Sequence, residues 1–467
     1  MCGVACIFSY GPQASGVNKE ELLRIQESMF KRGPDSSGVW VSNDNQIGLA
    51  HRRLSILDIS DAGSQPMLDK SNGNRIIFNG EIYNFRELKS HLESLGHNFL
   101  SQSDTEVLLK LYGTYGEKML SMLRGMFAFV IWDETKKGIF VARDHFGIKP
   151  LYVADDGNTL RFASQVKALL AGDSIELSME PAGHVGFLLW GYIPEPFTLF
   201  KGIRAVPAGT SIWVDSEGKQ TYNEYFNLAE EYSKDLNLGK KISEENKKER
   251  LHEALLDTVQ HHLISDVPTG VFLSAGLDSC SIANLAVESG ERNLNTLTLG
   301  FEEFLGTEND EVPLAEMFSK YSGTRQQTYR ISSESFSEQY DDLLDAMDQP
   351  SIDGVNTLVI CKAAKEAGLK VALSGLGGDE LFGGYSYFQK IPKIMSISSP
   401  FHNFPHLGRS FRKITSPFFK KYGSPKIAGL LEYGGDYAGA YLLSRSHHMP
   451  WEVSELLGKD LFKEGWD

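Results

Sequence analysis

The chain contains 467 residues, which exceeds what one compact core usually holds and predicts about two or three domains. Hydrophobic residues make up 41% and charged residues 23%, which is the balance of a globular protein. The net charge of −15 disfavours non-specific binding to nucleic acid or to an anionic membrane, and no apolar run approaches the roughly 18 residues of a membrane span.

The N-terminus lacks the basic and apolar pattern of a secretory signal. The four cysteines are too few and too scattered for a disulfide framework: Cys2, Cys6, Cys280 and Cys361. We therefore expect a protein of the reducing cytoplasm.

The first part of the chain reads as strands with a few helices. Apolar residues at helical spacing predict helices at 22–29 and 85–95. Dense apolar stretches bounded by polar turns predict strands at 75–78, 126–133 and 138–144. This mixture predicts an α+β domain over residues 1–212, with sheets covered by helices.

The second part of the chain has a different order of predicted elements. Residues 213–250 are expected to connect two domains, because 227–250 are nearly all polar and densely charged. Strands alternate with helices over residues 251–467, which predicts an α/β domain with a parallel sheet. Such sheets bind ligands at the carboxyl ends of their strands.

Cys2 raises a specific chemical question. Removal of Met1 would expose an α-amine with a pKa of about 8, which is partly neutral at pH 7 and suits the base of an N-terminal nucleophile. Taken alone, the same residue is better explained as a small buried side chain at the start of a strand.

Polar residues elsewhere in this domain have the types that acyl transfer needs. Asn79 and the backbone N–H of Gly80 follow a predicted strand and could donate to an oxyanion. Arg53 and Asp104 carry the charges that the two ends of an amino-acid substrate require. Singly, each also fits a surface or turn residue.

Together these segments resemble a known family. The matching stretches are MCGVACIF, RGPDSSG, AHRRLSILD, NGEIYN, SDTEV, GMFAFVIWD and ARDHFGIKPLY, over most of residues 1–165. They resemble the glutaminase domain of class II glutamine amidotransferases, and more closely that of asparagine synthetases. The resemblance implies an αββα sandwich of the N-terminal-nucleophile type.

The resemblance also implies roles for individual residues. Cys2 would attack the side-chain amide of glutamine and release ammonia, with Asn79 and Gly80 as the oxyanion hole. The glutamine itself would be held by Arg53, Glu81 and Asp104.

A second candidate site lies in FLSAGLDSCS, residues 272–281. A strand, a loop of small residues and a helix start follow one another, so backbone N–H groups and a helix dipole can approach an anion. Ser274 and Ser279 can donate to phosphate, and Asp278 could hold Mg²⁺. The lysine of the G-x-x-x-x-G-K-[ST] loop is absent. A plain strand-to-helix turn is the simpler interpretation of this segment alone.

This segment resembles the pyrophosphate loop S-G-G-L-D-S of ATP pyrophosphatases. Ala275 replaces the middle glycine, where a positive φ would be costly. LSGLGGDELFGGY (373–385) resembles the second motif of the synthetase domain in the same family. The resemblance places ATP beside Leu273, Ser274, Gly276, Asp278, Ser279, Leu299, Ser374 and Gly375. We expect Asp278 and Asp379 to share Mg²⁺.

The implied reaction has two halves. ATP adenylates a carboxylate, in the first place the β-carboxylate of aspartate, and releases pyrophosphate. Ammonia from the first site then attacks the acyl-adenylate through an internal passage. We therefore expect glutamine, ATP, Mg²⁺ and a carboxylate acceptor to bind, with no nucleic acid or membrane, and with a homodimer as an open alternative for assembly.

Three features depart from the family pattern, and the first two of them bear on the acceptor. The family's second motif reads S-G-E-G, and Leu376 stands at the position of its glutamate. Residues 350–360 contain no arginine for an aspartate carboxylate, and offer Asp353 and Asn356 instead. The sequence ends at LFKEGWD without the family's C-terminal lysine segment.

Two alternatives therefore stay open. The enzyme would amidate another carboxylate, such as a sugar acid of a surface polysaccharide. Otherwise the chain would be a shortened relative that binds nucleotide and retains only glutaminase or regulatory activity.

Overall fold

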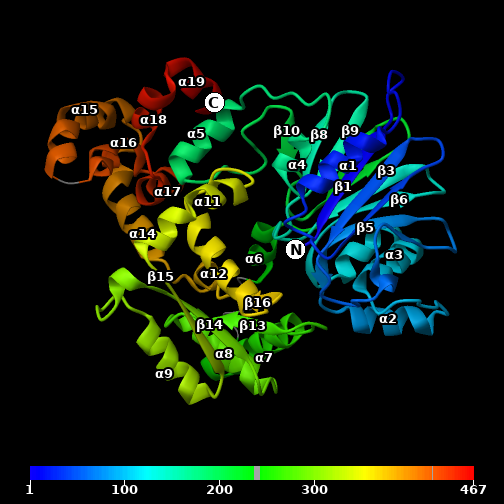
Figure 1. Ribbon diagram of the computed structural model, residues 1–467. Coiled ribbons are helices and arrows are strands. Elements are labelled where there is room, and N and C mark those ends of the chain that lie inside the picture. The colour runs from blue at the N-terminus through cyan, green and yellow to red at the C-terminus, as the bar shows by residue number, and fades with distance from the viewer. Residues whose placement is uncertain (236–241, 423, 467) are drawn as a thin grey trace. The chain divides into compact units, whose positions relative to one another are not determined.

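The computed structural model describes residues 1–235, 242–422 and 424–466 (Figure 1). Residues 236–241, which belong to the predicted connecting segment 213–250, lie outside the described residues. The chain divides into two compact units that are discontinuous in sequence. The first contains Met1–Ser178, Glu195–Asp348 and Leu358–Ser374, and the second contains Met179–Pro194, Gln349–Thr357 and Gly375–Asp467.

Two six-stranded antiparallel sheets form the N-terminal part of the first unit. The first sheet has the order β10 (Ile203–Ala205), β8 (Tyr152–Asp155), β9 (Thr159–Ala163), β1 (Gly3–Ser9), β3 (Ile47–Arg53) and β2 (Ser36–Val41). The second has the order β12 (Gln220–Glu224), β11 (Thr210–Val214), β7 (Gly138–Arg143), β6 (Gly125–Asp133), β5 (Arg75–Ile82) and β4 (Met67–Leu68).

The sheets pack face to face because their strands are apolar on both faces. In β1, Val4, Cys6 and Phe8 point into the core between the sheets, while Ala5 and Ile7 point to the opposite side. That opposite side is covered by α1 (Lys19–Ser28) and α4 (Val166–Leu170). The outer face of the second sheet is covered by α2 (Phe85–Ser94) and α3 (Asp104–Tyr115) (Figure 1). The layers are therefore αββα, as the resemblance implied.

Local sequence signals explain how two of these helices begin. Asn18 caps α1 by accepting from the backbone N–H of Glu20 at 2.9 Å, and Ser103 caps α3 by accepting from Thr105 at 3.1 Å. The cap at Ser103 fixes the position of Asp104, the first residue of α3. A predicted substrate-binding residue is thus placed by the helix start itself.

The first unit also contains a four-stranded parallel sheet. Its strand order is β15 (Arg325–Ile331), β14 (Asn295–Phe301), β13 (Thr269–Phe272) and β16 (Val371–Leu373). Apolar residues of α7 (Glu244–His262), α8 (Leu277–Glu288) and α9 (Val312–Ser322) pack on one side, and those of α12 (Gly354–Glu366) on the other. Val271 pairs with Leu373, so the segments that follow β13 and β16 leave the same edge of the sheet.

The remaining helices among the described residues of the first unit are α6 (Leu228–Asp235), α10 (Ser333–Glu338) and α11 (Tyr340–Ala346). The second unit is helical. It contains α5 (Pro181–Trp190), α13 (Gly378–Phe382), α14 (Tyr387–Ser398), α15 (Pro405–Tyr422), α16 (Leu430–Tyr433), α17 (Tyr437–Arg445), α18 (Pro450–Leu457) and α19 (Lys459–Trp466). Val185 and Leu189 of α5 pack against Leu442, Leu443 and Val453.

Two features differ from the continuous domains expected from sequence. The N-terminal sheet runs on to Glu224 through β12, past residue 212, and α5 belongs with the C-terminal helices. No helix among the described residues is long and apolar enough to cross a membrane.

Candidate active sites

Cys2 directly precedes β1, and its backbone and thiol are both held. Its carbonyl oxygen accepts from Nε of Arg32 at 2.9 Å. Its Sγ accepts from the backbone N–H of Leu54 at 3.4 Å, just beyond the end of β3. The chain before β1 is therefore fixed from two directions, by a cation and by a backbone donor.

The protonation states around Cys2 suit a thiol with a separate base. Burial raises the pKa of the Cys2 thiol, and the Leu54 N–H and the α-amine oppose this shift. Burial also lowers the pKa of the α-amine of Met1 from 8.0 to about 6, against the attraction of Cys2. Burial at this end of the chain thus favours the uncharged forms of both the thiol and an α-amine, and a neutral amine can accept the proton that the thiol must lose.

Asn79 and Gly80 lie on β5 opposite Ala128 and Phe127 of β6. Asn79 is 1% exposed, and its Nδ2 has no hydrogen-bond partner among the described residues. A Cβ at Gly80 would come within 2.2 Å of the Met126 carbonyl oxygen, so only glycine fits there. A buried amide donor without a partner is costly unless something else binds it.

Two acidic residues lie at this part of the site: Asp104, which is buried at the start of α3, and Glu81 of β5, which is half-buried. Oδ2 of Asp104 accepts from the backbone N–H of Ile82 at 3.0 Å, which brings the start of α3 against β5. Burial raises the pKa of Asp104 to about 6. Burial, reinforced by the Asp104 charge, raises the pKa of Glu81 well above its ordinary value. Such a pair gains from an arriving cation, as the ammonium group of an amino acid would provide.

Arg53 is 6% exposed and ends β3. Its guanidinium donates to the carbonyl oxygens of Ser60 at 2.9 Å and Leu57 at 3.2 Å, and to that of Asp58. These bonds fold the loop after β3 around the cation. They use three of the five N–H groups of a guanidinium.

Arg32 and Lys149 are two residues of this site that the sequence interpretation did not single out. Arg32 donates to Cys2, and its Nη2 is buried with no partner among the described residues. Lys149 is 5% exposed, and its Nζ lies 3.4 Å from Sδ of Met1. Both stand in the quoted motifs RGPDSSG and ARDHFGIKPLY, but only their burial reveals them as part of the site.

The loop between β13 and α8 is held together by hydroxyl groups. Oγ of Ser279 lies 2.8 Å from Oγ of Ser274 and also donates to the carbonyl oxygens of Ser274 and Gly276. Thr298 donates to the Leu273 carbonyl oxygen at 2.7 Å. Ala275 does not have a positive φ, so the alanine carries no backbone strain there.

The predicted nucleotide residues lie at the carboxyl edge of the parallel sheet. Asp278 is in the first turn of α8, and Leu299 is on β14. Ser374 follows β16 directly, on the same edge as Ser274.

The second motif crosses the boundary between the two units. Ser374 closes the first unit, whereas Gly375, Leu376 and Asp379 belong to the second. Asp379 lies in the first turn of α13, which Gly377 precedes with a φ of 98°. Leu376 is 89% exposed. Asp278 and Asp379 thus stand in different units, and their shared Mg²⁺ remains a prediction.

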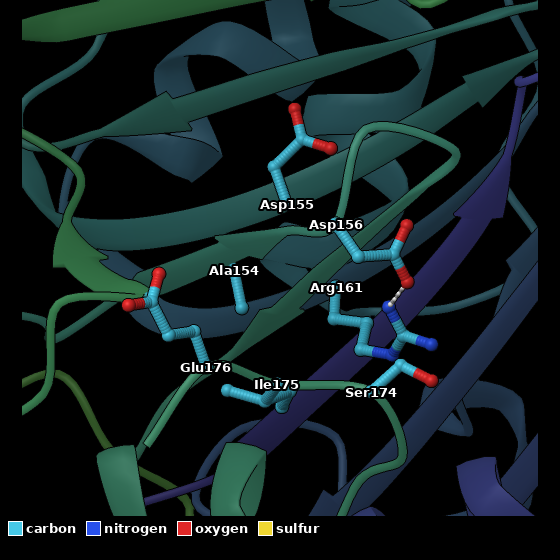
Figure 2. Close-up of a pocket in the computed structure, with 8 residues that line it drawn as sticks. Ala154, Asp155, Asp156, Arg161, Ser174, Ile175 and Glu176 are labelled. Atoms are coloured by element: carbon cyan, nitrogen blue, oxygen red, sulfur yellow. Dashed lines mark hydrogen bonds and ion pairs between the residues drawn. The ribbon is translucent and has the colours of Figure 1, made fainter. Parts of the chain in front are cut away.

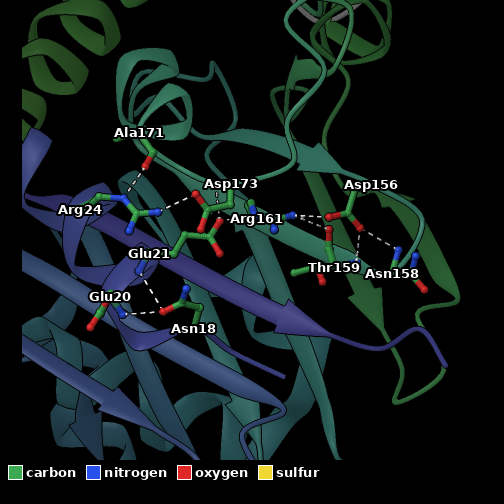
Figure 3. A network of polar contacts seen from close by, with 10 residues as sticks. All are labelled: Asn18, Glu20, Glu21, Arg24, Asp156, Asn158, Thr159, Arg161, Ala171 and Asp173. Atoms are coloured by element: carbon green, nitrogen blue, oxygen red, sulfur yellow. Dashed lines mark hydrogen bonds and ion pairs between the residues drawn. The ribbon is translucent and has the colours of Figure 1, made fainter. Parts of the chain in front are cut away.

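A pocket of about 300 Å³ lies elsewhere, where the β8–β9 hairpin meets residues 174–176 (Figure 2). Its lining includes the carboxylates of Asp155, Asp156 and Glu176. Arg161 at its base donates to Asp156 at 2.8 Å and to Glu21 of α1 at 2.6 Å (Figure 3). None of the predicted site residues lines it, so we assign this network to holding α1 on the sheet.

Comparisons with known proteins match both parts of the chain to known domains. Residues 1–226 match the glutamine amidotransferase domain, and residues 250–432 match asparagine synthase. The chain is 37% identical to asparagine synthetase [glutamine-hydrolyzing] 1 of Bacillus subtilis, over 84% of this chain and 60% of the relative. It is 34% identical to a putative asparagine synthetase [glutamine-hydrolyzing] 2 of Methanocaldococcus jannaschii, over 85% and 80%.

A third relative has another name. The chain is 30% identical to amidase chry2 of Gibberella zeae, over 87% of this chain and 62% of the relative. The chain spans 60% and 62% of the lengths of the Bacillus and Gibberella relatives. On both matched domains and on these identities, the chain belongs to the family of glutamine-hydrolysing asparagine synthetases, with a glutamine amidotransferase domain ahead of an asparagine synthase domain.

Proposed function

We propose that the protein transfers the amide nitrogen of glutamine to a carboxylate that it first activates with ATP. The observation that carries the first half is geometric: Cys2 is fixed beside β1 through its carbonyl oxygen and its Sγ, and Asn79 offers a buried Nδ2 without a partner among the described residues. The activity of the whole protein is a proposal that family membership supports, because the chain spans only part of the length of its relatives.

In the glutaminase step, loss of Met1 makes the α-amine that of Cys2. The amine takes the thiol proton, and Sγ attacks the side-chain carbonyl carbon of glutamine. Nδ2 of Asn79 and the N–H of Gly80 bind the oxyanion. The proton then passes to the leaving nitrogen, and water hydrolyses the thioester to glutamate.

The substrate is held by its two charged ends. Glu81 and Asp104 bind the ammonium group of glutamine, which relieves the repulsion between them. Arg53 has donors left for the carboxylate after its three bonds to the loop.

In the synthetase step, the loop of Ser274, Gly276 and Ser279 binds the phosphates of ATP with Leu273, Leu299, Ser374 and Gly375 around the nucleotide. Carboxylates are suitable ligands for Mg²⁺, so Asp278 and Asp379 would hold it. When bound, Mg²⁺ neutralises charge on the departing pyrophosphate. Ammonia attacks the acyl-adenylate, and AMP leaves.

Aspartate is the first acceptor to test. We place the reaction in the cytoplasm, and a homodimer is one possible form of assembly. A different carboxylate, such as a sugar acid, is the second candidate. The exposed Leu376, at the position of the family's glutamate, favours it, as does the lack of an arginine at 350–360. A glutaminase without synthetase activity is the third.

One experiment separates these functions. The protein is incubated with ¹⁵N-amide glutamine, ATP and aspartate, and the products are identified by mass spectrometry. We expect labelled asparagine, AMP and pyrophosphate. Labelled ammonia with no AMP would favour the glutaminase alone, and AMP formation only with another carboxylate would favour the second candidate.

The mechanism of the first half is tested with Cys2→Ala. We expect this variant to lose glutamine hydrolysis and to keep synthesis from free ammonia. Cys6→Ala, Cys280→Ala and Cys361→Ala are matched controls that should hydrolyse glutamine normally. Normal hydrolysis by Cys2→Ala, or by protein that retains Met1, would overturn the mechanism.

A further inference from the structure

Asp58 lies in the loop after β3, and its backbone and side chain are both engaged although the glutaminase mechanism gives it no role. Its φ is 44°, in the left-handed region that few non-glycine residues occupy. Its carbonyl oxygen accepts from the guanidinium of Arg53, and Oδ1 of its carboxylate accepts from the backbone N–H of Ser60 at 3.2 Å. Its surroundings therefore hold Asp58 in a conformation that this residue type seldom adopts by itself.

The second carboxylate oxygen of Asp58 reaches a distant segment. Oδ2 accepts from the backbone N–H of Gln102 at 2.7 Å, across 44 residues of sequence. Gln102 is followed by Ser103, which caps α3, and by Asp104, the first residue of that helix. The carboxylate of Asp58 thus joins the loop that surrounds Arg53 to the helix start that carries Asp104.

The backbone N–H of Asp58 is held from a third direction. It donates to Oδ2 of Asp266 at 2.8 Å, and the N–H of Asp266 donates to the carbonyl oxygen of Ile56 at 3.1 Å. Asp266 lies in the same unit, just before β13, and within the part of the chain that matches asparagine synthase. The loop around Arg53 is therefore bonded to α3 on one side and to the segment before β13 on another.

We propose that Asp58 is a positioning residue of the glutamine site, which sets the separation between Arg53 and Asp104. This inference rests on the proposed function, in which these two residues bind the two charged ends of glutamine. The carboxylate and the ammonium of an amino acid are attached to the same carbon, so one rigid spacing of the protein charges suits both. Fixing this spacing before the substrate arrives lowers the ordering cost of binding. Asp58 acts through its two neighbours and needs no contact with the substrate.

Removing the carboxylate should weaken glutamine binding more than it slows the reaction. Asp58→Gly deletes both side-chain acceptors, and glycine adopts the left-handed φ without strain. We expect KM for glutamine hydrolysis to rise about tenfold, with kcat within about twofold of the parent. Asp58→Asn must turn its NH2 group toward one of the two donors and keeps one acceptor, so KM should rise about threefold. An unchanged KM in both variants would overturn the proposal.

A double-mutant cycle separates positioning from a general weakening of the loop. Asp104→Asn removes the charge that Asp58 helps to place, so Asp58→Gly has less binding left to disturb in that background. The double variant should therefore raise KM by less than the product of the two single changes. Single changes that simply multiply would contradict the coupling. Asp61→Asn, at an exposed carboxylate of the same loop, is the matched control and should have the KM of the parent.

A second readout does not depend on activity. Hydrogen exchange with residue resolution compares the N–H of Gln102, which is bonded to Asp58, with that of Ser101, which donates to Glu106 at 2.7 Å. Asp58→Gly should speed exchange at Gln102 about tenfold and leave Ser101 as in the parent. Asp58→Asn is read in the same way, so a folding defect in one variant does not decide the outcome.

Parent-like exchange at Gln102 in both variants would overturn the link between the loop and α3. If the parent hydrolyses no glutamine, the proposed function fails, and the exchange at Gln102 still decides whether Asp58 holds this segment.

Discussion

Arg32 and Cys2 are joined by a hydrogen bond of 2.9 Å from the guanidinium Nε to the carbonyl oxygen, across 30 residues of sequence. The bond ties the turn after α1 to the residue that carries the reacting thiol. Because the thiol must meet the substrate at a fixed angle, small displacements of this backbone are expected to cost rate.

We therefore predict that Arg32→Gln lowers kcat for glutamine hydrolysis. The loss of a hydrogen bond from a charged donor is worth roughly 1.5–3 kcal/mol, or about a ten- to hundredfold change. Steady-state kinetics measures it, with synthesis from free ammonia as the internal reference. Arg24→Gln, which removes an exposed ion pair with Asp173, is the control and should leave both activities unchanged.

A second prediction compares two buried amides. Asn79→Ala should lower kcat by about 10²–10³, as expected for loss of an oxyanion donor. It should cost little stability, because Nδ2 of Asn79 has no partner among the described residues. A large fall in melting temperature with unchanged kcat would assign Asn79 to the core instead.

Gln65 provides the matched contrast. Its side-chain oxygen accepts from the Phe78 N–H at 2.6 Å, and its Nε2 donates to Thr105 at 3.2 Å. Gln65→Ala leaves the Phe78 N–H unpaired, so we expect a loss of about 1–3 kcal/mol in the free energy of unfolding. Denaturant unfolding of both variants measures the difference.

The structural features that could be predicted from the sequence depend on local signals, whereas those that could not depend on contacts between residues far apart in the chain. β6 and the helix at residues 85–94 were predictable, because period and flanking residues are local signals. The sequence of α5 does not show which residues the helix packs against, because Val185 packs against Leu442, which is far along the chain. Unit membership depends on such distant contacts.

The same distinction holds in the site. Cys2, Asn79 and Asp104 stand in motifs whose residue types suggest chemistry. Lys149 stands in one as well, yet an isolated lysine in a sequence is nearly always solvated. Only the buried Asp144 carboxylate, which fixes the backbone of this loop, turns Lys149 inward.

The acidic pair predicts a pH dependence of substrate binding. The pKa of Asp104 is about 6, so this carboxylate loses its charge as the pH falls through that value, and burial raises the pKa of Glu81 as well. Because the glutamine ammonium needs that charge, KM for glutamine should rise as the pH falls below about 6. Asp104→Asn should raise KM at pH 7 and flatten this dependence, and kinetics from pH 5 to 8 would detect both changes.

The pair of Glu81 and Asp104 also predicts that a substitution which impairs glutamine binding will stabilise the fold. A carboxyl group whose pKa is raised on folding destabilises the folded state at any pH above its ordinary value. Asp104→Asn keeps the acceptor for the Ile82 N–H and removes the buried charge. We expect it to stabilise the fold by about 1–3 kcal/mol at pH 7, with the gain vanishing near pH 4. Equal stability of the variant and the parent at pH 7 would contradict the buried charge.

The last prediction concerns nucleotide binding by the second site. Asp278 and Asp379 each lie in the first turn of a helix that follows a loop of small residues. If they hold Mg²⁺, Asp278→Asn and Asp379→Asn should each weaken Mg-ATP binding at least tenfold by calorimetry, since each removes a charged ligand. If they serve only as favourable charges near helix starts, each change costs about 0.3–1 kcal/mol of stability, and binding is unchanged. Asp341→Asn, also in the first turn of a helix but outside both motifs, is the control that should leave binding unchanged. Parent-like binding in both motif variants would show that the two carboxylates are structural, and the loop of Ser274 and Ser279 would then have to bind the phosphates through hydroxyl and backbone donors alone.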